Sequence, residues 1–375
     1  MAGIYIHVPF CRQACHYCDF HFSTSLKNKA AFLTALNKEI KFQKEYLGNE
    51  TISTIYFGGG TPSLLSKNEI VGIFDELNNY FTIDRDAEIT LEANPDDLTK
   101  SKLKELKQTP VNRLSIGIQS FFDEDLKWMN RAHSSHEAIT SVQSSQEIGF
   151  TNINVDLIYG LPTLSDERWI KNLQTVFELP VQHVSAYCLT VEPGTALAYS
   201  IKSGKTKNVN EDQSSDHFGI LLYEMNKNGF IQYEISNFGK ENFYSKHNSN
   251  YWLKKRYLGL GPSAHSYNGN SRRWNVANNN KYIQSIEKKQ VYFEEETLSP
   301  QNNYNEYVMT SLRTIWGIDL NYIKNNFSDS FSLFFIREAK KHIDNNHLLQ
   351  ADNKFFLTAA GKLFADKIAS DLFVV

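Results

Sequence analysis

The sequence has few cysteines, almost no net charge and no long apolar run, and each shortage excludes a class of protein. Only four of the 375 residues are cysteine, so a disulfide framework does not hold this fold together. The formal net charge is −3, from 39 basic and 42 acidic residues, and we therefore expect no nucleic-acid partner. No segment approaches the roughly 18 consecutive apolar residues of a membrane span. The start of the chain is too short and uncharged for a signal peptide, so we expect a cytoplasmic protein.

Three of the four cysteines are clustered near the start of the chain, at Cys11, Cys15 and Cys18. Thiolates spaced at i, i+4 and i+7 on a short loop can converge on one metal centre, and soft sulfur ligands favour iron–sulfur clusters or zinc. If the centre has four irons, three protein ligands leave one iron open to bind a substrate or cofactor directly. We interpret the motif as such an open cluster site.

Other interpretations of the cysteines stay open on spacing alone. Zinc would need a fourth ligand, for which His16 and His7 are the candidates. Structural zinc sites usually join two ligand pairs that are distant in sequence, and no second cysteine pair is present. The three thiols could also bind nothing. Cys188 stands apart and is interpreted as a small buried hydrophobe.

Strand-like runs alternate with amphipathic helices through the first two thirds of the chain. The expected strands are residues 3–8, 53–57, 87–91, 112–116, 152–157 and 183–189, and one helix is expected over 29–46. This order predicts parallel strands with right-handed crossovers, in a partial (β/α)6 barrel or an open doubly wound sheet. Polar and glycine-rich residues follow nearly every strand, which favours the barrel because such positions gather at one rim.

The residues at these strand ends are candidates for a binding site. Gly59 and Gly60 lie in the run Gly-Gly-Gly-Thr-Pro, where the backbone can approach a ligand and free N–H groups can receive a carboxylate. Each strand-end residue alone is typical of a turn. Together, Glu92, Gln119 and Asp156 are predicted to face one mouth of the barrel.

The character of the sequence changes near residue 235, and we expect three parts with boundaries at 1–235, 236–300 and 301–375. The middle part is a connecting region with a His-Asn-x-x-Tyr-Trp element at 247–252. The last part is predicted to be a smaller, mainly helical, winged-helix-like domain. Its expected elements are helices 304–316, 321–327, 330–345 and 358–372 and a hairpin at 347–356. The near-neutral charge favours protein contact or a lid function over DNA binding.

The CxxxCxxC motif after Tyr-Ile-His-Val-Pro-Phe, followed one β/α unit later by Gly-Gly-Gly-Thr-Pro, resembles the radical S-adenosylmethionine superfamily. More narrowly, the chain resembles the HemW family of heme chaperones, which is similar to oxygen-independent coproporphyrinogen III oxidase. The resemblance covers essentially the whole length. Further shared elements are Glu92–Pro95, Arg113–Gln119, Asn130–Arg131, Asp156–Pro162, Tyr233–Asn237, His247–Trp252 and Tyr257–Pro262.

This resemblance implies cofactors and the residues that contact them. The three cysteines would hold a [4Fe–4S] cluster whose fourth iron binds S-adenosylmethionine, and the reduced cluster would release a 5′-deoxyadenosyl radical. The residues that match contacts to the cofactor or its neighbour are Tyr5, Gly59, Gly60, Thr61, Glu92, Gln119, Arg131 and Asp156. Asp156 is predicted to accept ribose hydroxyls. Tyr17, between two ligating cysteines, is expected either to shield the cluster or to act as a plain aromatic plug.

Two subfamilies share this pattern, and departures from it favour one of them. The dehydrogenases that decarboxylate coproporphyrinogen III carry a fourth cysteine where this chain has Phe20, and an N-terminal extension that we expect to be missing here. The resemblance therefore favours the heme chaperones, in which the His-Asn-x-x-Tyr-Trp element is associated with heme. His247 is the predicted heme ligand, with Tyr251 and Trp252 packed on the porphyrin. His265 is a second choice of ligand, and a purely structural role is the alternative for His247.

Three functional hypotheses follow. The first is a chaperone that binds the cluster, S-adenosylmethionine and heme, receives electrons from a donor and delivers heme to respiratory or storage proteins. The second is a coproporphyrinogen III dehydrogenase, and the third is a cluster-stabilised scaffold that binds partners through its C-terminal domain. Whether the chain is an enzyme, forms a homodimer or reaches a membrane through its acceptor proteins stays open at this point.

Overall fold

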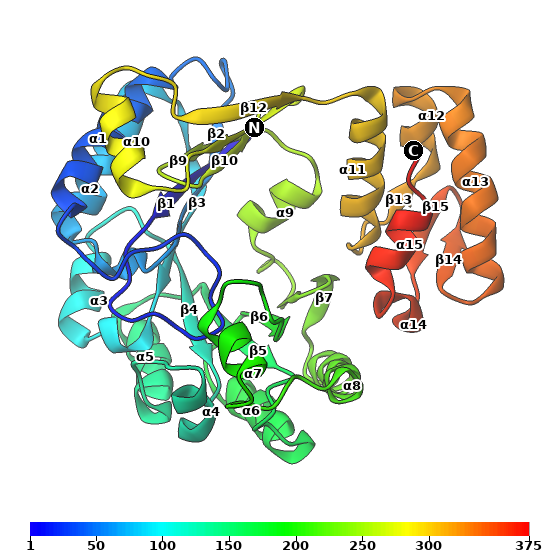
Figure 1. Cartoon of the computed structure of the whole chain (residues 1–375), viewed down its shortest axis with the longest axis horizontal. Helices are drawn as coiled ribbons and strands as arrows, with labels where there is room; N and C mark the ends of the chain where they lie inside the picture. Colours follow the sequence, from blue (N-terminus) through cyan, green and yellow to red (C-terminus); the bar gives the residue numbers. More distant parts are fainter. Residues whose placement is uncertain (375) are drawn as a thin grey trace.

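A computed structural model describes residues 1–374 of the chain. Its largest feature is a twelve-stranded sheet in the order β12-β11-β10-β9-β1-β2-β3-β4-β5-β6-β8-β7, with β1 to β6 parallel and adjacent in chain order (Figure 1). These six strands are β1 (Ala2–Val8), β2 (Ile52–Gly59), β3 (Ile83–Ala93), β4 (Arg113–Gln119), β5 (Ile153–Tyr159) and β6 (His183–Cys188). All six predicted strands are therefore present; β2 to β5 extend two or three residues beyond their predicted ends, and β6 ends one residue earlier than predicted.

Amphipathic helices connect the parallel strands and cover the sheet. Two of them begin with a serine followed three residues later by a glutamate: Ser66 with Glu69, and Ser134 with Glu137. In each pair the two side chains cap backbone N–H groups reciprocally, which sets the start of the helix. The helices of this part are α1 (Lys29–Phe42), α2 (Lys67–Tyr80), α3 (Lys100–Leu106), α4 (Asp123–Trp128), α5 (Ser135–Ile148), α6 (Asp166–Glu178), α7 (Ala196–Lys202) and α8 (Glu211–Lys227).

The barrel is not closed, because the outer edges of β1 and β6 pair with added strands instead of with each other. The edge of β1 pairs in parallel with β9, and the edge of β6 pairs in antiparallel with β8. The added elements are β7 (Ile231–Glu234), β8 (Asn237–Gly239), α9 (Lys246–Trp252), β9 (Tyr257–Leu260), β10 (His265–Tyr267), β11 (Ser271–Asn275), α10 (Asn279–Glu287) and β12 (Phe293–Thr297). The predicted partial α/β barrel is confirmed.

The strands of the region 236–300 belong to the same sheet as the barrel strands. They continue the sheet on both sides, and Leu258, Tyr282 and Ile286 share the large hydrophobic core with β1 and α1. We therefore propose that the larger structural unit extends through β12. These added strands were not predicted, since they are short and rich in polar residues, as in Phe-Glu-Glu-Glu-Thr of β12.

The C-terminal part has its own hydrophobic core, which includes Tyr304, Ile323, Phe335 and Leu348. Its elements are α11 (Pro300–Leu312), β13 (Ile318–Asp319), α12 (Leu320–Asn326), α13 (Asp329–Asp344), β14 (Leu348–Ala351), β15 (Lys354–Leu357), α14 (Ala359–Lys362) and α15 (Ala365–Asp371). The three strands form a small sheet in the order β13-β15-β14, so the smaller winged-helix-like domain is confirmed. The single last helix that we expected is divided in two, because Phe364 has a φ of −116°.

Helix α9, which carries the His-Asn-x-x-Tyr-Trp element, lies between the sheet and the C-terminal domain (Figure 1). It packs against β1 and β2 on one side and against α11 on the other. Within residues 1–374, no helix is long and apolar enough to cross a membrane.

Candidate cluster and cofactor site

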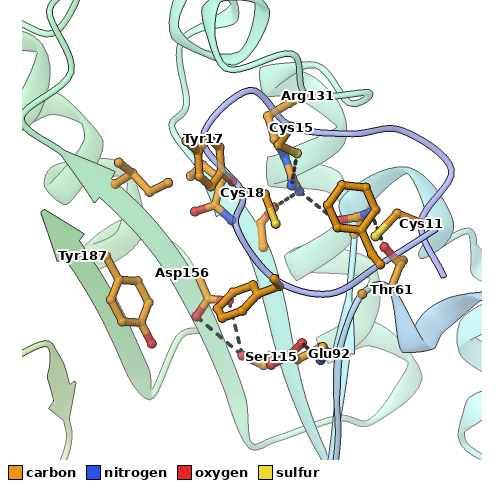
Figure 2. Close-up of a pocket in the computed structure, with 18 of the residues that line it drawn as sticks. Cys11, Cys15, Tyr17, Cys18, Thr61, Glu92, Ser115, Arg131, Asp156 and Tyr187 are labelled. Carbon is orange, nitrogen blue, oxygen red and sulfur yellow. Dashed lines mark hydrogen bonds between the residues drawn. The ribbon is translucent and has the colours of Figure 1, made fainter. Parts of the chain in front are cut away.

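A cavity of about 400 Å³ lies at the carboxyl ends of the parallel strands (Figure 2). Eleven of the thirteen predicted site residues line it, although they come from segments up to 145 residues apart, from Cys11 to Asp156. The eleven are Cys11, Cys15, Tyr17, Cys18, Gly59, Gly60, Thr61, Glu92, Gln119, Arg131 and Asp156. The two that do not line it are Tyr5 and His247. The topology thus brings the strand-end residues and the cysteine loop together.

The cysteines lie on the loop between β1 and α1. The backbone N–H of Cys11 donates to the carbonyl of Ser23 at 3.0 Å, which draws the two ends of the loop together. All three thiols are free and only partly exposed. Burial raises the pKa of the Cys11 thiol and raises the pKa of Cys18 to about 11, so both stay protonated at neutral pH unless a cation compensates the thiolate charge.

The glycine run holds the cysteine loop against the sheet. Gly59 has a φ of +102°, and a Cβ there would come within 2.5 Å of the His7 ring. A Cβ on Gly60 would lie 2.6 Å from the carbonyl oxygen of Phe10. Thr61 continues this contact, since its N–H donates to the same carbonyl at 2.7 Å. The glycines are therefore required for close backbone packing beneath the cysteines, as well as for lining the cavity.

Glu92 is a largely buried carboxylate at the end of β3. The hydroxyl of Tyr56 donates to its Oε1 at 2.8 Å, and the N–H of Gly59 donates to its Oε2 at 3.1 Å. Burial raises the pKa of Glu92 to about 7, with a further contribution from the nearby charge of Asp156. A carboxyl group with this pKa can accept hydrogen bonds from a bound cation or lose its proton when one arrives.

Arg131 connects the cysteine loop to the strands. Its Nη1 donates to the Cys15 sulfur at 3.3 Å, and its Nη2 donates to Asn94 Oδ1 and to the carbonyl of Gly117, both at 2.7 Å. In the described part of the chain its Nε is buried without a partner. Asn94 also donates to the hydroxyl of Thr61 at 3.3 Å. This network fixes a permanent positive charge beside the thiols, which favours their anionic, metal-binding form.

Asp156 lies on β5 and lines the cavity beside Ser115 of the neighbouring strand β4 (Figure 2). Asn154 Nδ2 donates to its Oδ1 at 2.7 Å, and the hydroxyl of Ser115 lies 3.5 Å from both carboxylate oxygens. Burial raises the pKa of this carboxyl group. Gln119, at the end of β4, has a φ of +71°, a strained conformation that often occurs at functional sites.

Several lining residues were not predicted individually, although the sequence carries a signal for them. Side chains of a strand alternate between faces, so every second residue points into the barrel. Polar or small residues recur with this period: Ser115, Gly117 and Gln119 on β4, and Asn154 and Asp156 on β5. The alternation of polar or small residues with apolar ones in these strands therefore predicts which side chains face the interior of the barrel.

The donor set fits an iron–sulfur cluster. Three thiols border one cavity beside a fixed guanidinium, and a cluster distributes its ligands over separate irons, so the sulfurs need not point at a single centre. Within residues 1–374, no three His, Cys, Asp or Glu side chains are positioned around one ion. The zinc candidates are engaged elsewhere: His16 Nδ1 lies 3.0 Å from the carbonyl of Trp128, and His7 Nε2 lies 2.8 Å from that of His21.

Tyr17 lies on the cysteine loop between Cys15 and Cys18, packs against the core and lines the cavity (Figure 2). Both a shielding role and a plain packing role are compatible with this place. The prediction that Cys188 is a small buried hydrophobe is wrong. It is exposed and lines the cavity, because it ends β6 at the mouth of the barrel rather than within the sheet.

His247 is buried at 2% exposure on α9, outside the cavity. Its Nδ1 lies 2.8 Å from the hydroxyl of Thr54 and its Nε2 lies 2.9 Å from that of Tyr251, so both ring nitrogens are hydrogen-bonded. Burial lowers the pKa of His247 to about 3, and the ring stacks on Tyr56 with centroids 5.0 Å apart. Binding iron would require one of these hydrogen bonds to break. Tyr5 stacks in the same aromatic group, 6.4 Å from the His247 ring.

Known proteins are similar to this chain in sequence and in fold. Residues 5–176 match the family model described as the Radical SAM superfamily. The chain is 34% identical over 371 residues to a Bacillus subtilis protein named heme chaperone HemW, covering 98% of each. It is 32% identical over 358 residues to a protein of the same name from Lactococcus lactis, covering 95% of this chain and 93% of that one. Among solved structures, the Escherichia coli coproporphyrinogen III oxidase HemN has a TM-score of 0.86 at 23% identity, covering 100% of this chain and 90% of that one, which shows the fold.

Proposed function

Because the chain belongs to the HemW family of radical S-adenosylmethionine proteins, we propose that it is a heme chaperone that binds a [4Fe–4S] cluster, S-adenosylmethionine and heme. The observation that carries this proposal is the similarity to proteins named heme chaperone over 98% of the chain, with all three cluster cysteines present. In this function the chain would deliver heme to acceptor proteins of respiration or storage and would take electrons from a separate donor.

Each part of the cavity has a role in this function. Cys11, Cys15 and Cys18 would hold the cluster, and Arg131 would donate a hydrogen bond to the Cys15 sulfur. When bound, the reduced cluster supplies an electron and S-adenosylmethionine is the group that accepts it. The chain's own residues bind and orient this cofactor.

The carboxylates and the glycine run supply the binding groups. Glu92, whose pKa of about 7 lies close to neutrality, is available to accept hydrogen bonds from an ammonium group. Asp156, on β5, would accept the two hydroxyls of a ribose. Gly59 and Gly60 would leave room for the cofactor beside the backbone, and Gln119, at the end of β4, would line the cavity between the strands that carry the two carboxylates.

The chaperone function is favoured over coproporphyrinogen III dehydrogenation by one position. Phe20 stands where the dehydrogenases carry a further cysteine, and it is 67% exposed beside the cavity. We place the protein in a reducing compartment such as the cytoplasm, since three partly exposed free thiols would be oxidised elsewhere. The C-terminal domain is then available as a contact surface or lid for acceptor proteins.

The test is anaerobic reconstitution of the whole chain with iron and sulfide, followed by two parallel assays. In one, hemin is added and its transfer to an apo-heme protein is followed by absorbance. In the other, coproporphyrinogen III is incubated with reductant and S-adenosylmethionine. We expect hemin binding and transfer without decarboxylation. Formation of protoporphyrinogen IX would identify a dehydrogenase instead, and failure to bind hemin would overturn the proposal.

A further inference from the structure

A second and larger groove, of about 720 Å³, lies between the sheet, α9 and the C-terminal domain. This volume lies within the range of cavities that hold cofactor-sized ligands. Its walls combine aromatic and cationic side chains with two carboxylates, Asp19 and Glu234. The aromatic residues are Tyr5, Phe20, Tyr187, Tyr251, Trp252, Tyr257 and Tyr267, and the cationic ones are Lys254, Lys255, Arg272 and Arg313. The groove therefore suits a flat, apolar ligand that carries negative groups.

The groove is continuous with the cluster cavity. Asp19, Phe20, Tyr187 and Asn248 line both. The two aromatic side chains of this shared wall are exposed, Phe20 at 67% and Tyr187 at 44%, although large apolar side chains are normally buried. Exposed aromatic rings at the junction of two cavities favour a ligand that covers them.

Among the histidines at this groove, only His265 has both ring nitrogens free of hydrogen bonds within residues 1–374. His7 bonds through both nitrogens, to the Tyr5 hydroxyl at 3.2 Å and to a backbone carbonyl, and His21 Nε2 lies 2.7 Å from Asn279 Oδ1. His265, at the start of β10, is exposed and makes no side-chain hydrogen bond within residues 1–374. Its ring stacks on Trp274, with centroids 6.4 Å apart, which orients it without using either nitrogen.

The four cationic side chains of the groove outnumber the carboxylates that pair with them, which are Glu306 and, for Arg313, Asp366. Lys254 and Arg272 share one carboxylate, that of Glu306, at 3.8 Å and 2.7 Å. Lys255 is exposed and makes no ion pair with any described residue.

We propose that this groove binds an iron porphyrin, with His265 as the axial ligand and with Lys255 and Arg272 facing the propionate carboxylates. The inference rests on the proposed function, since it names the heme site of the same chaperone. It differs from the sequence-based prediction in the ligand, because His247 is buried with both nitrogens occupied and does not line the groove. Heme would lie against Phe20 and Tyr187, next to the cluster cavity.

Titration of the reconstituted whole chain with hemin tests the ligand. We expect a 1:1 complex whose Soret band and resonance Raman spectrum indicate imidazole ligation. His265→Ala should weaken hemin binding on the order of tenfold or more, and free imidazole should restore the spectrum of the wild type. His136→Ala, on the exposed surface of α5, is the matched control and should bind hemin within about twofold of the wild type. His247→Ala should keep the spectrum of imidazole ligation, since the ring nitrogens of His247 bond to Thr54 and Tyr251 rather than face the groove.

The propionate contacts are tested with hemin dimethyl ester, in which both carboxylates are neutral. The wild type should bind hemin more tightly than the ester. Lys255→Gln, an exposed substitution that spares the fold, should reduce this difference in affinity. Unchanged spectrum and affinity in His265→Ala, with hemin still bound by the wild type, would overturn this inference alone. No hemin binding by the wild type would overturn the proposed function together with it.

Discussion

The cluster cavity and the aromatic groove lie side by side, but their side chains are held in opposite ways. In the cavity, Glu92, Arg131 and Asp156 each make two or more hydrogen bonds to neighbouring strands or loops. In the groove, the side chains of His265 and Lys255 make no hydrogen bond within residues 1–374, and the rings of Phe20 and Tyr187 are exposed. The cavity is thus preorganised for one cofactor geometry, whereas the groove can adjust to a ligand that must later leave.

This contrast suits a chaperone. A resident cofactor is bound tightly by groups that do not move, because preorganisation lowers the cost of binding. A cargo that is passed to another protein needs a site that holds it without a fully satisfied network. Substitutions in the cavity and substitutions in the groove should therefore have separate effects on the cluster and on hemin binding.

The largest effect is expected from Cys15→Ser, which removes one of the three thiols and the partner of Arg131. Without a third sulfur ligand the cluster should not assemble, and iron content after anaerobic reconstitution should fall to background. Hemin binding in the groove should remain, since no groove residue depends on this thiol. Iron analysis and the electron paramagnetic resonance spectrum of the reduced protein measure the first effect, and a hemin titration measures the second.

Cys188→Ser is the matched control for this experiment, since Cys188 lines the same cavity from β6. It should retain a full complement of iron. If Cys15→Ser also retained it, the assignment of the cluster ligands would be wrong. If Cys15→Ser lost hemin binding together with iron, the two regions would form one site rather than two.

The next effect is expected from Gly59→Ala, where a residue of the cavity packs against a residue of the groove. An alanine would strain the backbone at a φ of +102° and would place its Cβ 2.5 Å from His7, which lines the groove. We expect a loss of about 3 kcal/mol in the free energy of unfolding, from strain and overpacking together. Urea denaturation of the cluster-free chain measures it.

Gly72→Ala is the control for the glycine substitution. Gly72 lies within α2, and a Cβ there would meet no atom within 4 Å. This change should leave the stability unchanged or raise it by up to about 1 kcal/mol, because alanine favours helix more than glycine does. Equal destabilisation by both substitutions would mean that the contact with His7 has no role.

The sequence predicts the cavity far better than the groove, and the reason is physical. The cavity is built from residues next to strand ends, and the order of parallel strands brings such positions to one rim. Cys11, Glu92 and Asp156 could therefore be assigned to one site before their contacts were known. The alternation of strands and helices gave the partial barrel in the same way.

The groove has no comparable signature. It is assembled from a cysteine-loop residue, a β6 residue, α9 and short strands, represented by Phe20, Tyr187, Trp252 and Arg272. These strands carry too many polar residues for an apolar pattern, and their pairing with β1 is a long-range contact. His247 was predicted as the heme ligand because it belongs to a motif, but the structure shows that both of its ring nitrogens are hydrogen-bonded, to Thr54 and to Tyr251.

The free energy of unfolding should depend on pH through Glu92, which lines the cavity and not the groove. The pKa of Glu92 is about 7 in the folded chain, well above the ordinary value of 4.5. The folded state therefore holds this proton more tightly than the unfolded state does. The contribution of Glu92 to stability is fully present below pH 4.5 and is lost as pH rises toward 7, by at most about 3 kcal/mol.

Other carboxyl groups contribute to the same pH range, and Glu39, whose pKa is also about 7 through burial, is one of them. The measurement is therefore a difference: urea unfolding of the wild type and of Glu92→Gln from pH 4.5 to pH 8. The stability of the wild type relative to the variant should decrease over this range. A constant difference would show that Glu92 is already ionised, and hemin affinity should change equally with pH in both proteins.

The smallest effect is expected from Phe20→Ala, which removes one ring of the wall between the cavity and the groove. Because Phe20 is 67% exposed, the free energy of unfolding should change by less than about 0.5 kcal/mol. Hemin affinity should fall a few-fold, since a ring that stacks on a porphyrin contributes about 1 kcal/mol. Cluster iron should stay at the level of the wild type, and Phe42→Ala, on the partly exposed surface of α1, should change neither property. If the substitution instead lost iron and kept its hemin affinity, Phe20 would belong to the cluster cavity, and heme would have to bind away from this wall.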